Sequence, residues 1–276
     1  MHLPATPESD QPNARIPAAL HPLIQDYVGQ INAELPGLVT AFYLVGSIAL
    51  GDFVRGSDVD FVAVLARQAT PDDMTTLRAI HERIAHQYPA WQMEGRYWQP
   101  DALGGVDDAD SPFPKYFEGK LAWSTNSTLH AVTWWILQHH GIAVFGPPPQ
   151  TLVYTVDMGH LLREQRANLN SYWATWTRRP KRLAMLLSDW GVQWAVLGVL
   201  RQFYTFHEQR ITSKTQAGEY ALGRLPARWH RIIQEAIALR NGLDRRYYRS
   251  RLARASDAVH LLRFVIRSCN ERFGAL

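Results

Sequence analysis

The sequence predicts an α+β protein in which a mixed-sheet domain is followed by an all-α helical bundle domain. Between residues 19 and 150, short valine-rich runs alternate with amphipathic stretches, a pattern typical of a domain that combines strands and helices. From residue 157 onward, segments with helical spacing follow one another to the end of the chain. We therefore place a flexible arm at 1–18, the first domain at 19–150 and the helical domain at 157–276.

The elements of the first domain follow from periodicity and from turn residues. Thr70-Pro71 is followed by two aspartates, a strong helix N-terminus. The segment 99–120 contains two adjacent glycines, four aspartates and three prolines, so we expect a loop there. The predicted helices are 21–35, a short one at 48–53, 70–89 and 126–141, and the predicted strands are 38–47, 58–66, 91–98 and a short one from residue 142.

The second half of the chain reads as four or five helices, interrupted at Pro180, at 209–214, at Pro226 and at Gly242. Its most apolar stretch, 183–200, has the length of a membrane span. Because Asp189 and Gln193 interrupt it, we expect a buried core helix and no membrane segment.

Composition narrows the class of protein. The only cysteine is Cys269, which excludes an intrachain disulfide and a four-cysteine zinc site and favours a cytoplasmic protein. From Arg178 to the end there are 19 Lys and Arg against 7 Asp and Glu, whereas residues 1–177 hold 10 and 18. Such a division suggests metal binding in the first half and polyanion binding in the second. No aromatic-basic nucleic-acid motif accompanies the basic half, so nucleic acid is not the expected partner.

One motif carries chemistry. A predicted strand ends in Gly46-Ser47, a short spacer follows, and Asp58 and Asp60 open the next strand. Carboxylates at i and i+2 project to the same side of a strand, where they repel each other and raise each other's pKa. Mg²⁺ would relieve this repulsion, since it prefers carboxylate and phosphate oxygens. Glycine allows close backbone approach to a phosphate, and a serine hydroxyl can bind its oxygens.

This pattern resembles the nucleotidyltransferase superfamily that includes DNA polymerase beta. The resemblance implies that Asp58 and Asp60 hold Mg²⁺ and that Gly46-Ser47 binds the β,γ-phosphates. It also implies a third carboxylate on the next strand, for which Glu94 is the candidate, as general base, metal ligand or both. Ser57, which precedes Asp58, is placed with the nucleotide-binding residues.

The segment 201–236 resembles the helical domain of the streptomycin/spectinomycin adenylyltransferases, which transfer AMP from ATP to an aminoglycoside hydroxyl. The shared features are an arginine on a long helix, Ser-Lys at the start of the next helix, and "ALGRLP". By position, Arg201 and Lys214 would reach the nucleotide phosphates across the interdomain cleft. The resemblance implies ATP as a substrate and an aminoglycoside as the acceptor, and we expect a monomer.

Several positions depart from that family. Gly191 stands where an antibiotic-recognising acidic residue is expected, with Asp189 two residues away, and Arg240 replaces an adenine-side tyrosine. Trp123 is the candidate for a tryptophan expected in the linker before the helix at 126–141. A loop with three acidic residues could attract a polycationic acceptor; these are Asp107, Asp108 and Asp110.

Two other functions remain open at this point. The same chemistry could act on another small molecule, on a protein or on a tRNA end. Alternatively, the chain could be a nucleotide-binding, antitoxin-like protein without catalytic activity. The intact set of candidate side chains argues against a degenerate site; they are Ser47, Asp58, Asp60, Glu94 and Lys214.

Overall fold

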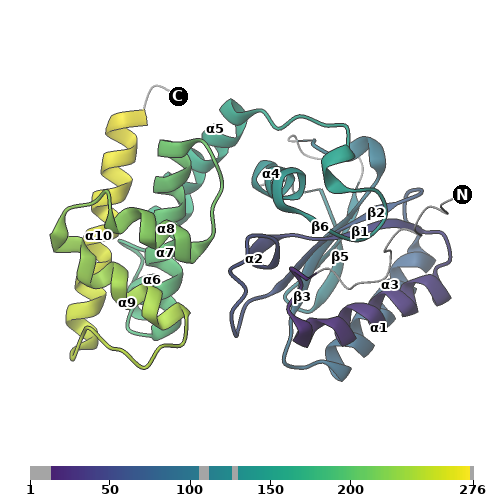
Figure 1. Ribbon diagram of the computed structural model, residues 1–276, viewed down its shortest axis with the longest axis horizontal. Helices are drawn as coiled ribbons and strands as arrows, with labels where there is room; N and C mark the ends of the chain where they lie inside the picture. The colour runs from purple at the N-terminus through teal and green to yellow at the C-terminus, as the bar shows by residue number, and fades with distance from the viewer. Residues whose placement is uncertain (1–13, 106–111, 126–129, 274–276) are drawn as a thin grey trace, which may run out of the picture.

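The computed structural model describes residues 14–105, 112–125 and 130–273 of the chain. Two domains lie side by side, one built on a sheet and one made of helices (Figure 1). The expected α+β architecture, a mixed sheet followed by a helical bundle, is confirmed. The acidic loop that contains Asp107, Asp108 and Asp110 lies outside the described residues, as do residues 1–13 of the predicted arm.

The remaining part of the predicted arm, 14–18, is packed on the first domain. Ile16 belongs to the hydrophobic core. The Arg15 guanidinium donates to the backbone oxygens of Ala49 and His140, at 2.6 and 2.7 Å. Residues 14–18 therefore pack with the sheet domain, because an apolar side chain and an arginine attach this segment to it.

The first domain contains a six-stranded sheet of order β5-β4-β3-β2-β1-β6. Only β2 and β3 run parallel, and the other neighbours are antiparallel, so the sheet is mixed. The strands are β1 (Val39–Leu44), β2 (Val59–Leu65), β3 (Met93–Trp98), β4 (Phe113–Phe117), β5 (Lys120–Ser124) and β6 (Ile142–Phe145).

Helices cover both faces of this sheet. The helices α1 (His21–Glu34) and α3 (Pro71–Gln87) pack on one face, and α4 (His130–His140) packs on the other (Figure 1). The N-terminus expected at Thr70 is a capping box, since the Thr70 hydroxyl accepts from the Asp73 N–H at 3.2 Å while the Asp73 carboxylate accepts from the Thr70 N–H at 2.7 Å. Burial on both faces explains why β2 is almost continuously apolar.

Two predictions for this domain were wrong. The expected loop at 99–120 contains β4, which pairs with β5 in a hairpin whose turn holds Glu118 and Gly119 at positive φ. Both strands are short, lie toward the sheet edge and carry polar residues, so alternation alone did not reveal them. The short helix expected at 48–53 begins earlier, as α2 (Gly46–Ala49), so that Gly46 and Ser47 belong to it.

The helical domain is arranged around one long central helix, α7 (Asp189–Glu208). Its residues pack against three neighbours, namely α8 (Lys214–Leu222), α9 (His230–Arg240) and α10 (Arg251–Phe273). Two shorter helices precede it, α5 (Met158–Asn168) and α6 (Pro180–Met185), with a π-helical turn at Leu169–Trp173. The described residues thus form six α-helices here, one more than the upper expectation of five.

The apolar stretch 183–200 is divided between two helices. The end of α6 and the turn at Ser188 take up its first residues, and α7 takes up the rest. The Ser188 hydroxyl caps α7 by accepting from the Gly191 N–H at 3.0 Å. Within the described part of the chain, no helix is long and apolar enough to cross a membrane.

Candidate active site

Three carboxylates occupy one end of the β2–β3 pair. Asp58 immediately precedes β2, Asp60 is its second residue, and Glu94 lies directly opposite Asp60 in the parallel ladder. Since side chains alternate along a strand, Asp60 shares its face with Val62, which packs in the α4-side core. The predicted grouping of the three residues at one edge of the sheet therefore follows from strand register.

The electrostatics of this group are unfavourable without a counter-charge. Burial raises the pKa of Asp60 to about 6, and the charge of Asp58 adds to the rise. Burial likewise raises the pKa of Glu94 to about 7, with further contributions from Asp58 and Asp60. The pKa of Asp58 is also raised by burial, although Lys214 opposes the change. The group consequently favours binding of protons or cations.

The Gly46-Ser47 turn lies directly against Asp60. Val45 donates its N–H to the Asp60 carbonyl at 2.9 Å. Gly46 has φ +60°, and a Cβ at this position would lie 1.9 Å from Asp60 Oδ2. The Ser47 hydroxyl is buried without a hydrogen-bond partner. A buried donor without a partner beside a site that favours cations is suited to an incoming phosphate oxygen.

Ser57 is part of the turn that leads into Asp58. Its hydroxyl accepts from the Val54 N–H at 3.1 Å, and its own N–H donates to the Val54 carbonyl at 2.9 Å. The hydroxyl proton of Ser57 is not used in this turn and can still be donated.

The helical domain contributes positive charge to the same place. Arg201, on α7, has a buried Nε without a partner, and burial lowers its pKa while Asp60 and Asp52 act in the opposite direction. Lys214 is the first residue of α8. Burial and the positive charges of Arg201 and Arg240 lower its pKa to about 7, whereas the negative charges of Asp60 and Asp58 act to raise it. The two cations predicted from the sequence therefore face the carboxylates across the domain boundary.

Sequence reasoning missed three residues at this site. Arg96 is two residues beyond Glu94 on β3, and therefore on the same face, and its buried Nε has no partner. Lys115 pairs with Arg96 across β3 and β4. The i+2 spacing of Glu94 and Arg96 on one strand could have indicated that Arg96 belongs to the site. Trp194 lies under the Lys214 ammonium, whose Nζ is 4.3 Å from the ring centroid, a contact between α7 and α8 that no spacing reveals.

Trp123 is not brought to the carboxylates. It shares a face of β5 with Leu121, which packs in the core on the α1 and α3 side. Glu94 projects from the opposite face of the sheet. We therefore leave Trp123 out of the candidate site.

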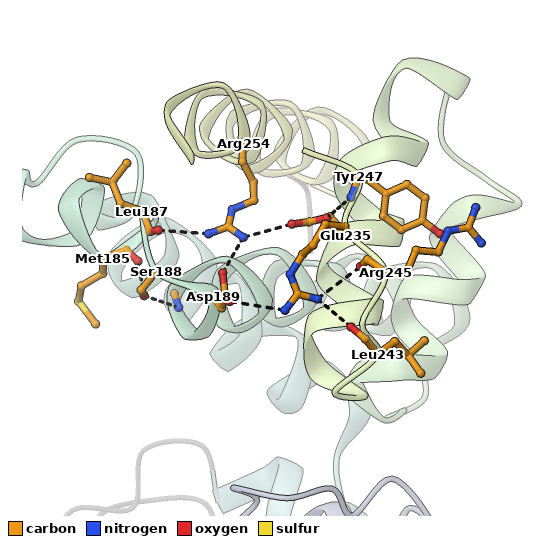
Figure 2. Close-up of polar contacts among 11 residues, drawn as sticks. Met185, Leu187, Ser188, Asp189, Glu235, Leu243, Arg245, Tyr247 and Arg254 are labelled. Atoms are coloured by element: carbon orange, nitrogen blue, oxygen red, sulfur yellow. Dashed lines mark hydrogen bonds and ion pairs between the residues drawn. The ribbon is translucent and has the colours of Figure 1, made fainter. Parts of the chain in front are cut away.

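Asp189 is already engaged by two arginines. Its carboxylate accepts from Arg254 at 2.6 Å and lies 3.9 Å from Arg246. Figure 2 shows Arg254 between Asp189, the buried Glu235 and the Leu187 carbonyl. The charge of Asp189 is thus neutralised within the helical domain, which argues against recognition of a cationic acceptor by this residue.

A side chain at position 191 has no room. A Cβ on Gly191 would lie 2.0 Å from the Met185 carbonyl oxygen. The close packing of α6 against the start of α7 therefore explains why this chain has glycine where an acidic residue was expected.

The residues present fit Mg²⁺ when it is shared with a triphosphate. Within the described ranges, no group of three or more His, Cys, Asp or Glu side chains could hold a metal ion, so Glu94 does not complete a three-carboxylate metal site with Asp58 and Asp60. Mg²⁺ commonly takes one or two protein carboxylates and completes its shell with phosphate oxygens and water. Asp58 and Asp60 could supply that pair, since burial raises the pKa of both carboxyls and the pair therefore favours protons or cations.

Two family models match the chain in tandem. The nucleotidyltransferase domain matches residues 27–114, and the C-terminal domain of aminoglycoside adenylyltransferase matches residues 174–263. The first match contains the three carboxylates and the Gly46-Ser47 turn, and the second contains Arg201 and Lys214. The two sides of the candidate site thus fall in the two matched regions.

Similar proteins extend over most of the chain. An aminoglycoside (3'') (9) adenylyltransferase from Escherichia coli is 23% identical, and the alignment covers 87% of this chain and 92% of that protein. The crystal structure of a spectinomycin adenyltransferase from Enterococcus faecialis, determined with ATP and spectinomycin, superposes with a TM-score of 0.65 at 12% identity. That superposition covers 88% of this chain and 99% of the other, and it shows that the two folds are alike.

These findings define the class of protein first: the chain is a nucleotidyltransferase. Its second domain matches the C-terminal domain of aminoglycoside adenylyltransferase, and the similarity to an enzyme of that name extends over 87% of the chain. The protein is accordingly an adenylyltransferase-like enzyme that resembles the aminoglycoside adenylyltransferases.

Gly46→Ala should disable the site without unfolding the domain. The new Cβ would displace the Asp60 carboxylate, and misplacement by about 1 Å can cost roughly 100-fold in rate. Gly51→Ala is the matched control, because Gly51 also has positive φ, at +68°, but has no atom within 4 Å of an added Cβ. We expect kcat/KM to fall about 100-fold only for Gly46→Ala. Equal losses in both variants would show that backbone strain, and not Asp60, is responsible.

Proposed function

We propose that the protein transfers AMP from ATP to a hydroxyl of an aminoglycoside-type antibiotic of the streptomycin/spectinomycin class and releases pyrophosphate. The observation that carries this proposal is the arrangement of Asp58, Asp60 and Glu94 opposite Arg201 and Lys214. Carboxylates on one side and cations on the other match the needs of a metal-bound triphosphate. The similarity of both domains to aminoglycoside adenylyltransferases supports the nature of the acceptor.

In this proposal the triphosphate is held from both domains. Ser47 donates its hydroxyl to a phosphate oxygen, with Gly46 and Ser57 shaping the turn on either side of the spacer. Arg201 and Lys214 bind the oxygens of the β- and γ-phosphates and stabilise the charge on the departing pyrophosphate. Mg²⁺, held by Asp58 and Asp60, would neutralise phosphate charge and orient the α-phosphate for attack.

Glu94 is the proposed general base. A pKa of about 7 lets its carboxylate accept a proton near neutral pH. It takes the proton of the acceptor hydroxyl as that oxygen forms a bond to the α-phosphorus. The bond between the α-phosphorus and the bridging oxygen of the β-phosphate breaks in line, and pyrophosphate leaves. Positioning and electrostatics supply most of the acceleration.

A second candidate keeps the chemistry and changes the acceptor. Arg96 and Lys115 place positive charge next to Glu94, and Asp189 is neutralised by Arg254 and Arg246. These observations favour an acceptor with less positive charge than a polycationic antibiotic, such as a neutral hydroxylated metabolite. We also propose that the enzyme acts in a reducing compartment, the cytoplasm, which fits the single buried Cys269. That the enzyme acts as a monomer stays a prediction.

Pyrophosphate release from ATP and Mg²⁺ distinguishes these acceptors. We expect release to depend on streptomycin or spectinomycin and to be absent with ATP alone. The panel should include other aminoglycosides and neutral and anionic polyols. Release with a neutral polyol, but with no antibiotic, would favour the second candidate. ATP binding without release for any acceptor would contradict both and favour a non-catalytic nucleotide-binding protein.

Asp58→Asn should abolish turnover while the fold persists. Loss of a charge that binds the metal-bound triphosphate should lower kcat by at least about 100-fold. The melting temperature without ligands should be unchanged or higher, because one of three repelling carboxylates is removed. Asp244→Asn, in an exposed segment outside the helices and strands, is the control and should change neither quantity. Wild-type activity in Asp58→Asn would refute the metal assignment.

A further inference from the structure

The two domains are joined by a buried ion pair next to the site. Asp52 follows α2 in the first domain, and Arg240 is the last residue of α9 in the second. Arg240 Nη2 and Nε lie 2.9 and 3.0 Å from Asp52 Oδ2, and Nη2 also donates to the Asp52 carbonyl at 2.7 Å. The side chain of Asp52 is only 9% exposed, and that of Arg240 only 6%. Arg240 thus binds both the side chain and the backbone of one residue in the other domain.

Asp52 is connected to the proposed phosphate-binding residues on both sides of the boundary. Its N–H donates to the Ser47 carbonyl at 2.9 Å. Its Oδ2 accepts from the Thr215 N–H at 3.3 Å, and Thr215 follows Lys214 at the start of α8. A single residue, Asp52, therefore links the turn that carries Ser47, through its backbone N–H, to the helix that carries Lys214, through its carboxylate.

A buried ion pair is a weak source of net stability, because desolvation offsets much of the attraction. Its directional contacts, however, fix geometry. Here they fix the position of Ser47 relative to Lys214, residues from different domains that a triphosphate must contact together. Arg240 is also close enough for its charge to lower the pKa of both Lys214 and Arg201.

We propose that Asp52 and Arg240 form an interdomain clamp that positions Ser47 and Lys214 for the same triphosphate. This inference rests on the proposed function in that the triphosphate is taken to be ATP. The clamp residues are positioning residues: they act through Ser47 and Lys214. The proposal also accounts for arginine at position 240, where the family resemblance suggested a tyrosine near the adenine, since the Arg240 guanidinium makes its hydrogen bonds and its ion pair with Asp52.

The clamp is tested by the Kd for ATP with Mg²⁺, measured by calorimetry without an acceptor. Arg240→Met and Asp52→Asn should each weaken ATP binding by roughly 10-fold or more, as expected when contacting groups are misplaced. Arg240→Lys keeps the charge and should restore part of the affinity. The double variant Asp52→Asn/Arg240→Met leaves no unpaired buried charge, so it remains informative if a single variant fails to fold. It should bind ATP about as weakly as either single variant, because the two residues act as one unit.

Arg254→Met is the matched control. Arg254 and Glu235 form an ion pair that is equally buried but lies wholly within the helical domain, as Figure 2 shows. This variant should lose thermal stability and keep the wild-type Kd for ATP. An unchanged Kd in the double clamp variant, or a loss equal to the product of the two single losses, would overturn the clamp. Wild-type ATP binding without pyrophosphate release would instead count against the proposed function alone, and no ATP binding by the wild-type chain would overturn both.

Discussion

Mutual repulsion of three carboxylates is the constraint on which the site depends. Strand register places Asp60 and Glu94 opposite each other, and Asp58 precedes Asp60 by two residues. Burial keeps water from screening them, so their pKa values rise. Within the first domain, the fold relieves this repulsion only in part, through Arg96 and Lys115. It brings Arg201 and Lys214 from the second domain, and it leaves the Ser47 hydroxyl and the Arg201 Nε without partners.

The acceptor side is organised differently from the nucleotide side. The triphosphate would be held by the charges of Arg201 and Lys214, by the Ser47 hydroxyl and by Mg²⁺ on Asp58 and Asp60. Among the described residues, neither position 189 nor position 191 offers a free acidic side chain to a cationic acceptor. Asp189 is bound by arginines, and Gly191 is required by the packing of Met185. Arg96 and Lys115 add positive charge beside Glu94. Nucleotide transfer and acceptor choice are therefore separable questions in this protein.

The nucleotide side could be predicted from the sequence because its determinants are local or lie in regular elements. The i, i+2 spacing of Asp58 and Asp60 and the glycine of Gly46-Ser47 fix their own geometry. The β4–β5 hairpin could not be predicted, since short edge strands lack a strong apolar alternation. The contact between Asp52 and Arg240 could not be predicted either, because the two residues are 188 positions apart and no local sequence pattern relates them.

Proton release on Mg²⁺ binding tests most directly whether the carboxylates share their charge with a cation. With the pKa of Asp60 at about 6 and that of Glu94 at about 7, both raised, part of the group is protonated at pH 6.5. Titrating Mg²⁺ into the protein with a non-hydrolysable ATP analogue, after subtracting the release from the analogue alone, should liberate about one proton at pH 6.5. The release should fall as the pH rises and turn into net uptake by about pH 8.5, where both carboxylates are already ionised and Lys214, with a pKa of about 7, gains a proton on binding phosphate. Binding without proton release at pH 6.5, or release that grows as the pH rises, would contradict the account.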